Sequence, residues 1–294
     1  MVFATEAYGR TMTMKKLIEL DAAIDGGDDS IIQLQRGDCL ELMKRLPDKS
    51  VDLTVTSPPY DNLRTYNGNI SQWSFEKFKQ IAKELYRITK DGGVVVWIVA
   101  DATIKGSETG TSFRQALRFM DCGFNLHDTM IYEKNNAIPL NHNRYEQTFE
   151  YMFVFSKGKP KTFNPIKIQC KTAGLKTSKR TFYQRREDNI PSEGHKNGAV
   201  KADKIRNNIW QYSVGGGKIK HPAVFPLQLA KDHIVSWSNE NDTVLDCFMG
   251  SGTTGVACVN LKRNFIGMEI EEEYFKVAEE RINNARLNQQ TGGD

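Results

Sequence analysis

Short apolar runs rich in β-branched residues alternate with helical patterns along this chain, and this alternation limits its fold more than any other feature. Residues 51–56 have the composition of a strand, and residues 94–99 are continuously apolar. Between them, apolar residues recur at helical spacing over 75–88, after Ser74 as a potential cap. Continuous apolar runs suit parallel strands covered on both faces. The sequence therefore predicts an α/β fold with a largely parallel sheet.

The same pattern extends over most of the chain. It predicts further strands at 31–35, 127–132, 150–156, 243–247 and 264–269. Further helices are expected at 40–46, 112–120, 225–236 and 253–260, with a last helix carrying Tyr274, Ala278 and Ile282 on one face. The glycine pair at 91–93 is expected to end the helix that begins after Ser74.

One internal segment departs from this pattern in both periodicity and charge. Residues 157–220 hold sixteen Lys or Arg against four Asp or Glu, although the net charge of all 294 residues is only +4. This segment is expected to be an insertion or a small subdomain. The expected organisation is thus a leader (1–30), a first half (31–156), the basic region (157–220), a second half (221–287) and a tail (288–294).

Composition excludes several classes of protein. Hydrophobic residues make up 39% and charged residues 26%, and no apolar run is long enough to cross a bilayer. The first 30 residues lack a signal-peptide pattern, so a soluble, cytoplasmic protein without a membrane partner is expected. The five cysteines lie far apart without a C-x-x-C pair, which argues against disulfides and against a bound metal.

A glycine-containing turn between a predicted strand and a predicted helix has the position of a ligand site. Gly250 and Gly252 let the backbone bend and approach a ligand, and the following helix offers unpaired N–H groups. The turn lacks the P-loop lysine and the dinucleotide glycine spacing. Glu269 ends the next strand roughly 20 residues on, where a carboxylate can bind ribose hydroxyls. The alternative is a solvated acid preceding Glu271.

A second turn, Ser57-Pro58-Pro59-Tyr60, follows the predicted strand at 51–56. The two prolines fix two φ angles and remove two backbone donors, so the turn presents carbonyl oxygens beside the Ser57 hydroxyl. Such an acceptor-rich turn suits a substrate that carries N–H groups. A plain strand-to-loop turn with an exposed aromatic residue is the alternative.

The two turns together resemble the bacterial and phage amino-methyltransferases of DNA. Ser57-Pro58-Pro59-Tyr60 matches that family's (S/N/D)-P-P-(Y/F) turn, and residues 248–252 match its F-x-G-x-G loop. The order of the two motifs is similar to the β class, and the resemblance covers residues 31–287. It implies a class I S-adenosylmethionine-dependent methyltransferase sheet, Rossmann-like and in circularly permuted order. The strand before Asp38 would then complete the half that begins at Thr243.

The resemblance also implies roles for individual residues. In the turn, Ser57 and the Pro58 carbonyl would accept hydrogen bonds from an exocyclic amine and direct its lone pair at a sulfonium methyl, while Tyr60 stacks on a base rotated out of the duplex. Residues 61–69 would order over the base or the cofactor, and His221 belongs to a segment leading to the methionine side of the pocket. The expected catalytic residues are Ser57, Pro58, Pro59 and Tyr60, and the expected cofactor-binding residues are Asp38, Asp246, Phe248, Gly250, Ser251, Gly252, Thr253 and Glu269.

The basic region falls where the β class keeps its target-recognition region, so the expected partner is double-stranded DNA. Candidate contacts to phosphates and base edges are Lys179, Arg180, Arg185 and Arg186, interleaved with Phe182 and Tyr183. A solvated basic loop is the alternative. The resemblance leaves open a homodimer and a cognate restriction endonuclease of a restriction-modification system.

Several functions remain open on the sequence. A serine at the first position of the turn favours N4 of cytosine in this family, with N6 of adenine as the alternative. Methylation at cytosine C5 is excluded because none of the five cysteines follows a proline as a C5 nucleophile would. A catalytically silent DNA-binding module and a methyltransferase acting on RNA or a protein amide are the further alternatives.

Overall fold

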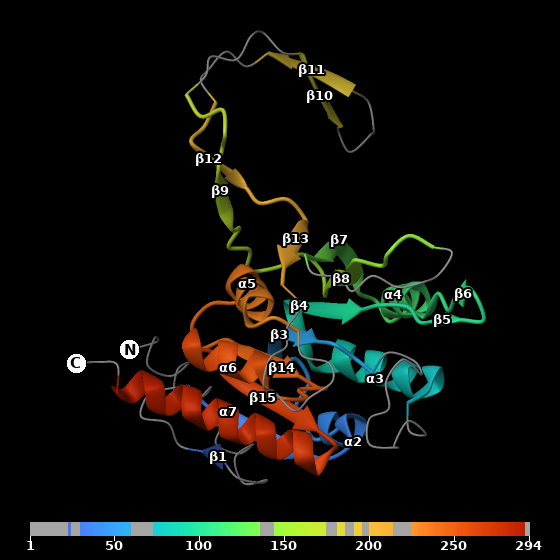
Figure 1. Cartoon of the computed structure of the whole chain (residues 1–294), viewed down its shortest axis with the longest axis vertical. Helices are drawn as coiled ribbons and strands as arrows, with labels where there is room; N and C mark the ends of the chain where they lie inside the picture. Colours follow the sequence, from blue (N-terminus) through green and yellow to red (C-terminus); the bar gives the residue numbers. More distant parts are fainter. Residues whose placement is uncertain are drawn as a thin grey trace. The chain divides into compact units, whose positions relative to one another are not determined.

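The fold is a nine-stranded sheet with helices packed on both faces (Figure 1). The computed structural model describes residues 23–24, 30–59, 73–135, 144–174, 181–185, 191–195, 200–213 and 225–291. The chain divides into a large unit, Met1–Asn164 with Asn208–Asp294, and a small unit, Pro165–Asn207. Within the described residues, no helix is both long and apolar enough to span a bilayer.

The sheet is mixed, because β8 runs antiparallel to its two neighbours and β1 antiparallel to β2, while the other neighbouring strands are parallel. The first core strand, β2, pairs in parallel with the last strand, β15, so segments from opposite ends of the chain lie side by side. In spatial order the strands are β1 (Ala23–Ile24), β2 (Ile32–Arg36), β15 (Asn264–Glu269), β14 (Thr243–Asp246), β3 (Val51–Thr56), β4 (Thr89–Val99), β8 (Phe149–Ser156), β7 (Asn125–Lys134) and β13 (Ile209–Tyr212).

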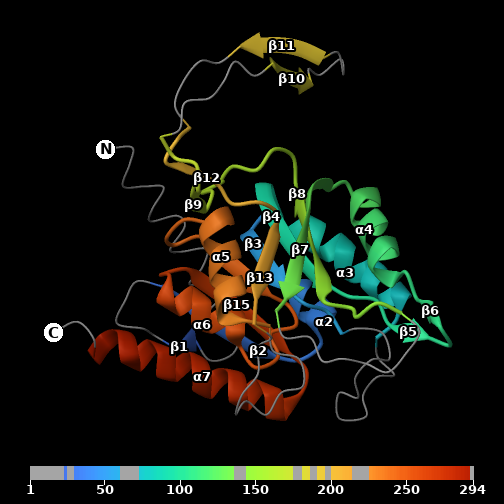
Figure 2. The same ribbon diagram turned by 45° about the horizontal axis from the view of Figure 1, so that its top comes forward.

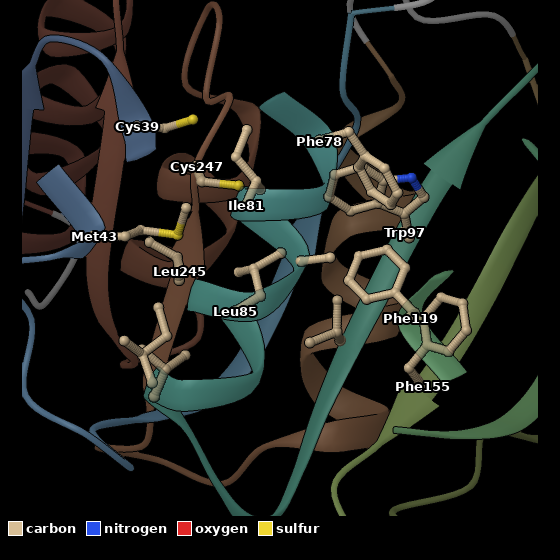
Figure 3. Packing of buried hydrophobic residues seen from close by; sticks show 14 of the residues in the cluster. Cys39, Met43, Phe78, Ile81, Leu85, Trp97, Phe119, Phe155, Leu245 and Cys247 are labelled. Carbon is tan, nitrogen blue, oxygen red and sulfur yellow. The ribbon is translucent and has the colours of Figure 1, made fainter. Parts of the chain in front are cut away.

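Two helical layers cover the sheet (Figure 2). One layer holds α2 (Cys39–Met43), α3 (Phe75–Ile88) and α4 (Thr111–Asp121), and the other holds α5 (Leu227–Trp237), α6 (Thr253–Asn260) and α7 (Glu272–Thr291). Under the first layer, the rings of Phe78, Trp97 and Phe119 meet with centroids 5.0 to 5.6 Å apart (Figure 3). Burial of such large apolar side chains provides the main driving force for docking the helices.

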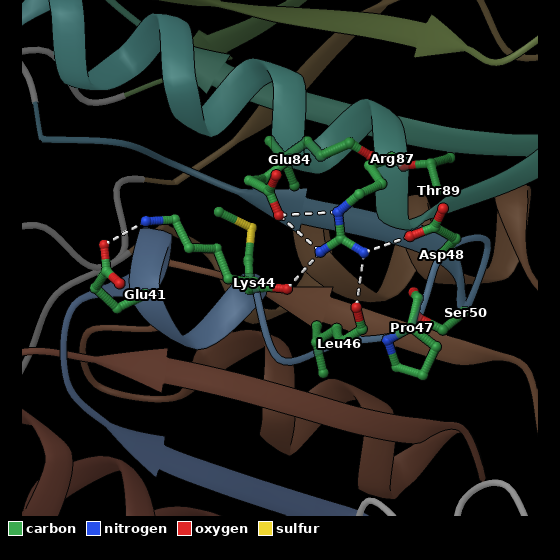
Figure 4. Close-up of polar contacts among 11 residues, drawn as sticks. Glu41, Lys44, Leu46, Pro47, Asp48, Ser50, Glu84, Arg87 and Thr89 are labelled. Atoms are coloured by element: carbon green, nitrogen blue, oxygen red, sulfur yellow. Dashed lines mark hydrogen bonds and ion pairs between the residues drawn. The ribbon is translucent and has the colours of Figure 1, made fainter.

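Side-chain hydrogen bonds hold both ends of helix α3. The Ser74 hydroxyl accepts the Lys77 N–H at 3.1 Å and so caps the first turn. In the last turn, the Arg87 guanidinium donates to Glu84 and Asp48 at 2.6 Å each, and to the Leu46 carbonyl at 2.8 Å (Figure 4). Arg87 therefore ties α3 to the segment that follows α2.

Most of the predicted elements are confirmed within a few residues, and two predictions at element boundaries are wrong. The glycine pair at 91–93 lies inside β4, which begins at Thr89, because Val51 pairs with Thr89 ahead of a bulge in the ladder. Helix α2 ends at Met43 rather than at residue 46. The pattern also missed the small hairpin of β5 (Thr103–Ile104) and β6 (Ser107–Glu108).

The small unit consists of two antiparallel ribbons. One pairs β9 (Lys167–Gln169) with β12 (Asp203–Ile205), and the other pairs β10 (Thr181–Arg185) with β11 (Pro191–His195). This unit is narrower than the basic region of 157–220. Residues before it belong to the large unit, where Asn164 N–H donates to the Ser236 carbonyl at 2.9 Å. After it, β13 adds an edge strand beside β7.

Candidate active site

The two turns singled out in the sequence lie at the ends of adjacent parallel strands. Residues 57–59, here called the acceptor turn, follow β3, and residues 247–252, here called the glycine loop, follow β14. The two strands are in register, with Leu245 opposite Thr54. The carboxyl ends of parallel strands are the usual place for ligands in open α/β sheets. The sheet therefore brings together two motifs that are about 190 residues apart in sequence.

A single carboxylate connects the two turns. Asp246, the last residue of β14, accepts a hydrogen bond from the Thr56 hydroxyl at Oδ1 and another from the Thr254 hydroxyl at Oδ2, each at 2.6 Å. Its Oδ1 also accepts the Phe248 N–H at 3.1 Å. Thr56 is the last residue of β3, and Ser57 follows it directly. The acceptor turn and the glycine loop are thus linked through one side chain.

The Asp246 carboxylate is buried, with 1% of its surface exposed. Burial raises the pKa of Asp246 to about 6, against the hydrogen bonds from Thr254 and Thr56, which lower it. In the described part of the chain, the interactions that lower this pKa are hydrogen bonds and not a cation. Asp246 is expected from the sequence to bind a cofactor, and within the described residues its carboxylate accepts from Thr56, Thr254 and Phe248.

The glycine loop uses its two glycines in different ways. Gly250 has a φ of +49° and donates its N–H to Glu269 Oε2 at 2.9 Å. Gly252 has a φ of +78° and precedes α6, and a Cβ at this position would lie 2.9 Å from the Cβ of Ala278 on α7. Side-chain packing and backbone conformation therefore both require glycine at 252. The sequence pattern pointed only to the turn and to close approach of a ligand.

Glu269 ends β15 beside the glycine loop and is 9% exposed. Its Oε2 accepts the Gly250 N–H and its Oε1 accepts the Glu271 N–H, each at 2.9 Å. Burial raises the pKa of Glu269, and these backbone hydrogen bonds lower it, leaving it above its usual value. The alternative that Glu269 is merely a solvated acid is wrong.

Asp38 lies at the end of the neighbouring strand β2, where it caps α2 by accepting the Leu40 N–H at 2.9 Å. Its other oxygen forms an ion pair with Lys77 of α3. Burial raises the pKa of Asp38. The hydrogen bond and charge of Lys77, together with hydrogen bonds from backbone N–H groups, lower it by more, so the net shift of the pKa is downward. Sequence reasoning missed Lys77, because only the docking of α3 brings it to β2.

Arg281 of α7 is a second residue that the sequence did not reveal. Its guanidinium donates to the Ser251 carbonyl, to the Ser251 hydroxyl at 2.8 Å and to the Thr253 hydroxyl at 3.4 Å. Burial lowers the pKa of Arg281. Ser251 and Thr253, expected to bind a cofactor, are both buried beneath this contact. Arg281 therefore holds the glycine loop from the α7 side.

Phe248 forms the aromatic part of the site. Its ring meets Trp73 edge-on at 5.5 Å between centroids and Trp97 at 6.1 Å. Phe248 is partly buried against the core cluster under α3. Trp97 is the residue paired with Thr56 in the β3–β4 ladder, so this aromatic group belongs to the part of the core next to the end of β3.

Some of the expected site residues cannot be placed. Tyr60, Lys179, Arg180, Arg186, His221 and the segment 61–69 lie outside the described residues. Arg185 is part of β10, without a described side chain. Of the acceptor turn, Pro58 is buried, and Ser57 and Pro59 are partly exposed. Among the residues that are described, no cluster of three His, Cys, Asp or Glu is arranged to hold a metal ion.

Comparison with known proteins gives consistent matches. Residues 51–280 match the N6_N4_Mtase family, described as DNA methylase. Orphan methyltransferase M.BamHII of Bacillus amyloliquefaciens is 51% identical over 252 residues, which is 83% of this chain and 92% of that relative. The solved structure of the M1.HpyAVI–SAM complex is 28% identical, with a TM-score of 0.55, and covers 85% of this chain and 99% of the other. The cytosine-N4-specific PvuII DNA methyltransferase is 22% identical, with a TM-score of 0.62 and coverage of 92% and 98%.

Proposed function

The chain belongs to the N6_N4_Mtase family of DNA methylases, and from this premise we propose that it methylates an exocyclic amino nitrogen of a DNA base, with N4 of cytosine preferred. It is an S-adenosylmethionine-dependent DNA methyltransferase with the class I methyltransferase fold. The observation that carries the proposal is the junction of the acceptor turn and the glycine loop at Asp246. The pairing of β2 with β15 supports the circularly permuted order of the sheet.

The site has the chemistry that S-adenosylmethionine requires. Three backbone N–H groups lie against the Glu269 carboxylate, which has about four acceptor sites and so retains capacity for a ribose hydroxyl. Asp38, one strand further along, is proposed to lie near the adenine, and Gly250 would let the backbone pass close to the ligand. The bound cofactor supplies an electrophilic methyl group.

The acceptor turn is proposed to prepare the nucleophile. An exocyclic amine is weakly nucleophilic because its lone pair is delocalised into the ring of the base. The Ser57 hydroxyl and the Pro58 carbonyl would accept the two amine hydrogens, which favours a pyramidal nitrogen with its lone pair localised. Tyr60 would stack on the flipped base and hold it there. The Phe248 ring, packed against Trp73 and Trp97, would keep water away from one side of this site.

The choice of base follows from Ser57. A serine at this position favours cytosine N4 in the family that the sequence resembles. Adenine N6 presents a similar amine and is the second candidate. An RNA or protein-amide substrate and a catalytically silent DNA-binding module have less support, because the family is one of DNA methylases and the turn retains its acceptors.

Recognition of double-stranded DNA is proposed to rest on the basic region of 157–220, including Lys179, Arg180, Arg185 and Arg186. Phosphate neutralisation requires clustered Lys and Arg, and this region holds an excess of twelve positive charges.

A cytoplasmic location follows from a chromosomal or phage DNA substrate. The homodimer and the cognate endonuclease left open by the sequence remain proposals, which sedimentation analysis of the purified chain and sequencing of the neighbouring genes would test.

Methyl transfer from labelled S-adenosylmethionine tests the proposal directly. The chain is incubated with duplex DNA, single-stranded DNA, RNA and protein, and the modified nucleosides are identified by mass spectrometry. We expect N4-methylcytosine in duplex DNA. Detection of N6-methyladenine instead would identify adenine as the methylated base. Label in RNA or protein alone, or DNA binding without transfer, would contradict the proposal.

Substitution of Ser57 tests the role of the acceptor turn. We expect Ser57→Ala to lower kcat by about 100-fold, because one acceptor of the amine hydrogens is lost, while the affinity for the cofactor stays nearly unchanged. Ser107→Ala, on the exposed β6, is the control and should keep full activity. Tyr60→Ala should also lower turnover. Full activity of the Ser57→Ala, Tyr60→Ala double variant would refute the assignment.

A further inference from the structure

The contacts of Asp246 differ from those of a residue that serves folding alone. Both oxygens of this buried carboxylate accept 2.6 Å hydrogen bonds from threonine hydroxyls on two different elements, β3 and α6. Thr56 is itself 0% exposed. A buried charge without a cationic partner costs free energy even when it is hydrogen-bonded, and an apolar pair of similar volume is often at least as stable. Stability therefore gives a weak reason for this arrangement.

Geometry gives a stronger reason. Thr56 is bonded covalently to Ser57, and the N–H of Phe248, within the glycine loop, donates to the same Oδ1 that accepts from Thr56. The two turns thus share one acceptor atom. A hydrogen-bonded carboxylate at this point fixes the position of the acceptor turn relative to the glycine loop at the carboxyl edge of the sheet.

We propose that Thr56 and Asp246 are positioning residues, which fix the acceptor turn against the glycine loop and so set the approach of the base nitrogen to the methyl donor. This inference rests on the proposed function, since it concerns how the same site aligns its two substrates. Neither residue touches the reacting atoms in this scheme. A displacement of about 1 Å in a group-transfer site can lower the rate by about 100-fold. The pair is therefore expected to influence kcat more than binding.

The chain contains a matched control for Thr56. Thr54 lies two residues earlier on β3, is equally buried at 0% exposed, and its hydroxyl has no hydrogen-bond partner among the described residues. Thr54→Val and Thr56→Val replace the same hydroxyl by the same methyl group on the same strand. Only the second removes a contact to Asp246. A difference between the two variants therefore reports on the contacts of the Thr56 hydroxyl, which are the 2.6 Å bond to Asp246 and a longer, weaker contact from the Cys247 thiol at 3.9 Å.

The experiment measures kcat and the KM values for S-adenosylmethionine and duplex DNA in the full-length chain. Thr56→Val should lower kcat by about 10- to 100-fold and change both KM values by less than about threefold. Thr56→Ser keeps the hydroxyl and should retain kcat within about threefold of the unaltered chain. Thr54→Val should do the same. Circular dichroism at the assay temperature verifies that each variant is folded.

Three results would overturn the inference. The first is a Thr56→Val variant with unchanged kcat, and the second is an equal loss of kcat in Thr54→Val. The third is a loss in Thr56→Val confined to the KM for the cofactor, which would make Thr56 part of binding rather than of alignment. If Thr56→Val does not fold, the comparison of Thr56→Ser with Asp246→Asn replaces it. A loss of kcat is then expected only in Asp246→Asn. An unaltered chain that transfers no methyl group to any DNA overturns the proposed function itself, and this inference with it.

Discussion

Two buried acids, Asp246 and Glu269, give the site its electrostatic character at the scale of single residues. Both have raised pKa values because burial disfavours the charged form. Asp246 is held by two threonine hydroxyls and one backbone N–H, and Glu269 by backbone N–H groups alone. Asp246 thus connects side chains of β3 and α6 with the backbone of the glycine loop, whereas Glu269 accepts only from backbone groups close to the end of β15. Burial and partners therefore give two acids at neighbouring strand ends different roles.

The raised pKa of Asp246 predicts a pH dependence of stability. Between its unfolded value of 3.8 and about 6, the folded chain binds this proton more tightly than the unfolded chain does. Stability from this group therefore rises as the pH falls, and between pH 7 and 5 the gain is about 1 kcal/mol. Asp246→Asn cannot titrate and should lack that gain. Urea unfolding of both proteins at the two pH values measures the difference.

The comparison with the Asp246→Asn variant is needed because other groups titrate nearby. Burial also raises the pKa of Glu269, which contributes with the same sign in both proteins. Cys247 and Cys258 face Asp246, and burial raises their pKa values well above the usual range, so they stay neutral throughout. Asp38 has a lowered pKa, and its contribution is lost only in more acidic solution. An unchanged pH dependence in the variant would show that Asp246 does not titrate as described.

Gly252 provides a test of packing behind the site. Gly252→Ala places a Cβ 2.9 Å from the Cβ of Ala278 and keeps a φ of +78°, so overpacking and backbone strain add to about 2–5 kcal/mol of lost stability. Gly158→Ala is the matched control, because its φ of +75° is nearly the same and no atom lies within 4 Å of the added Cβ. The control should lose about 1 kcal/mol. Equal losses in urea unfolding would mean that contact with α7 does not matter.

At the scale of elements, the site is built by helices that hold strand-end loops in place. Helix α3 supplies Lys77 to Asp38, and α7 supplies Arg281 to the glycine loop. These contacts join residues far apart in the sequence, and each is partly or fully shielded from water, where charged hydrogen bonds are stronger. Helices α3 and α7 therefore cover the sheet and also hold the loops at the strand ends through side-chain hydrogen bonds.

Arg281 tests this role of α7. Arg281→Met keeps an extended side chain but removes the donors to Ser251 and Thr253, and we expect the dissociation constant for S-adenosylmethionine to rise about 10-fold. Stability should fall by about 1–3 kcal/mol, because acceptors in the loop lose their partner. Isothermal titration calorimetry and urea unfolding provide the two values. Lys276→Met, which breaks an exposed pair with Glu272 on the same helix, should change neither by much.

At the scale of the whole molecule, charge is divided between the two units. The small unit holds eleven Lys or Arg and four Asp or Glu, although the whole chain has a net charge of only +4. The two residues of the large unit that flank the small unit in sequence are both hydrogen-bonded within the large unit. The Asn164 N–H donates to the Ser236 carbonyl, and the Asn208 carbonyl accepts the Ile131 N–H, each at 2.9 Å. By sequence, the proposed DNA contacts at 179–186 fall within the small unit, and the proposed cofactor contacts of the glycine loop belong to the large unit.

Removal of the small unit tests this division. Replacement of residues 165–207 by a flexible linker should leave the large unit folded and able to bind S-adenosylmethionine, because its sheet and core are complete. Affinity for duplex DNA should fall by about 100-fold or more, and the slope of log K against log salt should become shallower. Fluorescence anisotropy with labelled duplexes at several salt concentrations measures both. Unchanged DNA affinity would place DNA recognition elsewhere.

Much of this architecture was accessible from the sequence, for local reasons. Strand and helix positions follow from hydrophobic period and capping residues such as Ser74, which act within a few residues. The two turns could be located because glycine and proline impose their backbone geometry wherever they stand. Their combination predicted the family, which the comparisons confirm. The start of β4 at Thr89 and the edge strand β13 could not be predicted, because each depends on pairing with a distant strand.

The amino-acid sequence by itself thus determined most of the core strands and helices and the two motifs, because these depend on nearest-neighbour propensity and on residue type. The class of reaction followed from the resemblance of the two motifs to a known family. Only the tertiary structure decided that Thr56 donates to Asp246 190 residues away, that Arg281 holds Ser251, and that Gly252 faces Ala278. Each of these contacts arises when separate helices and strands dock on one sheet. No local pattern encodes such pairs, since hydrophobic burial brings the elements together and fixes which polar groups then meet.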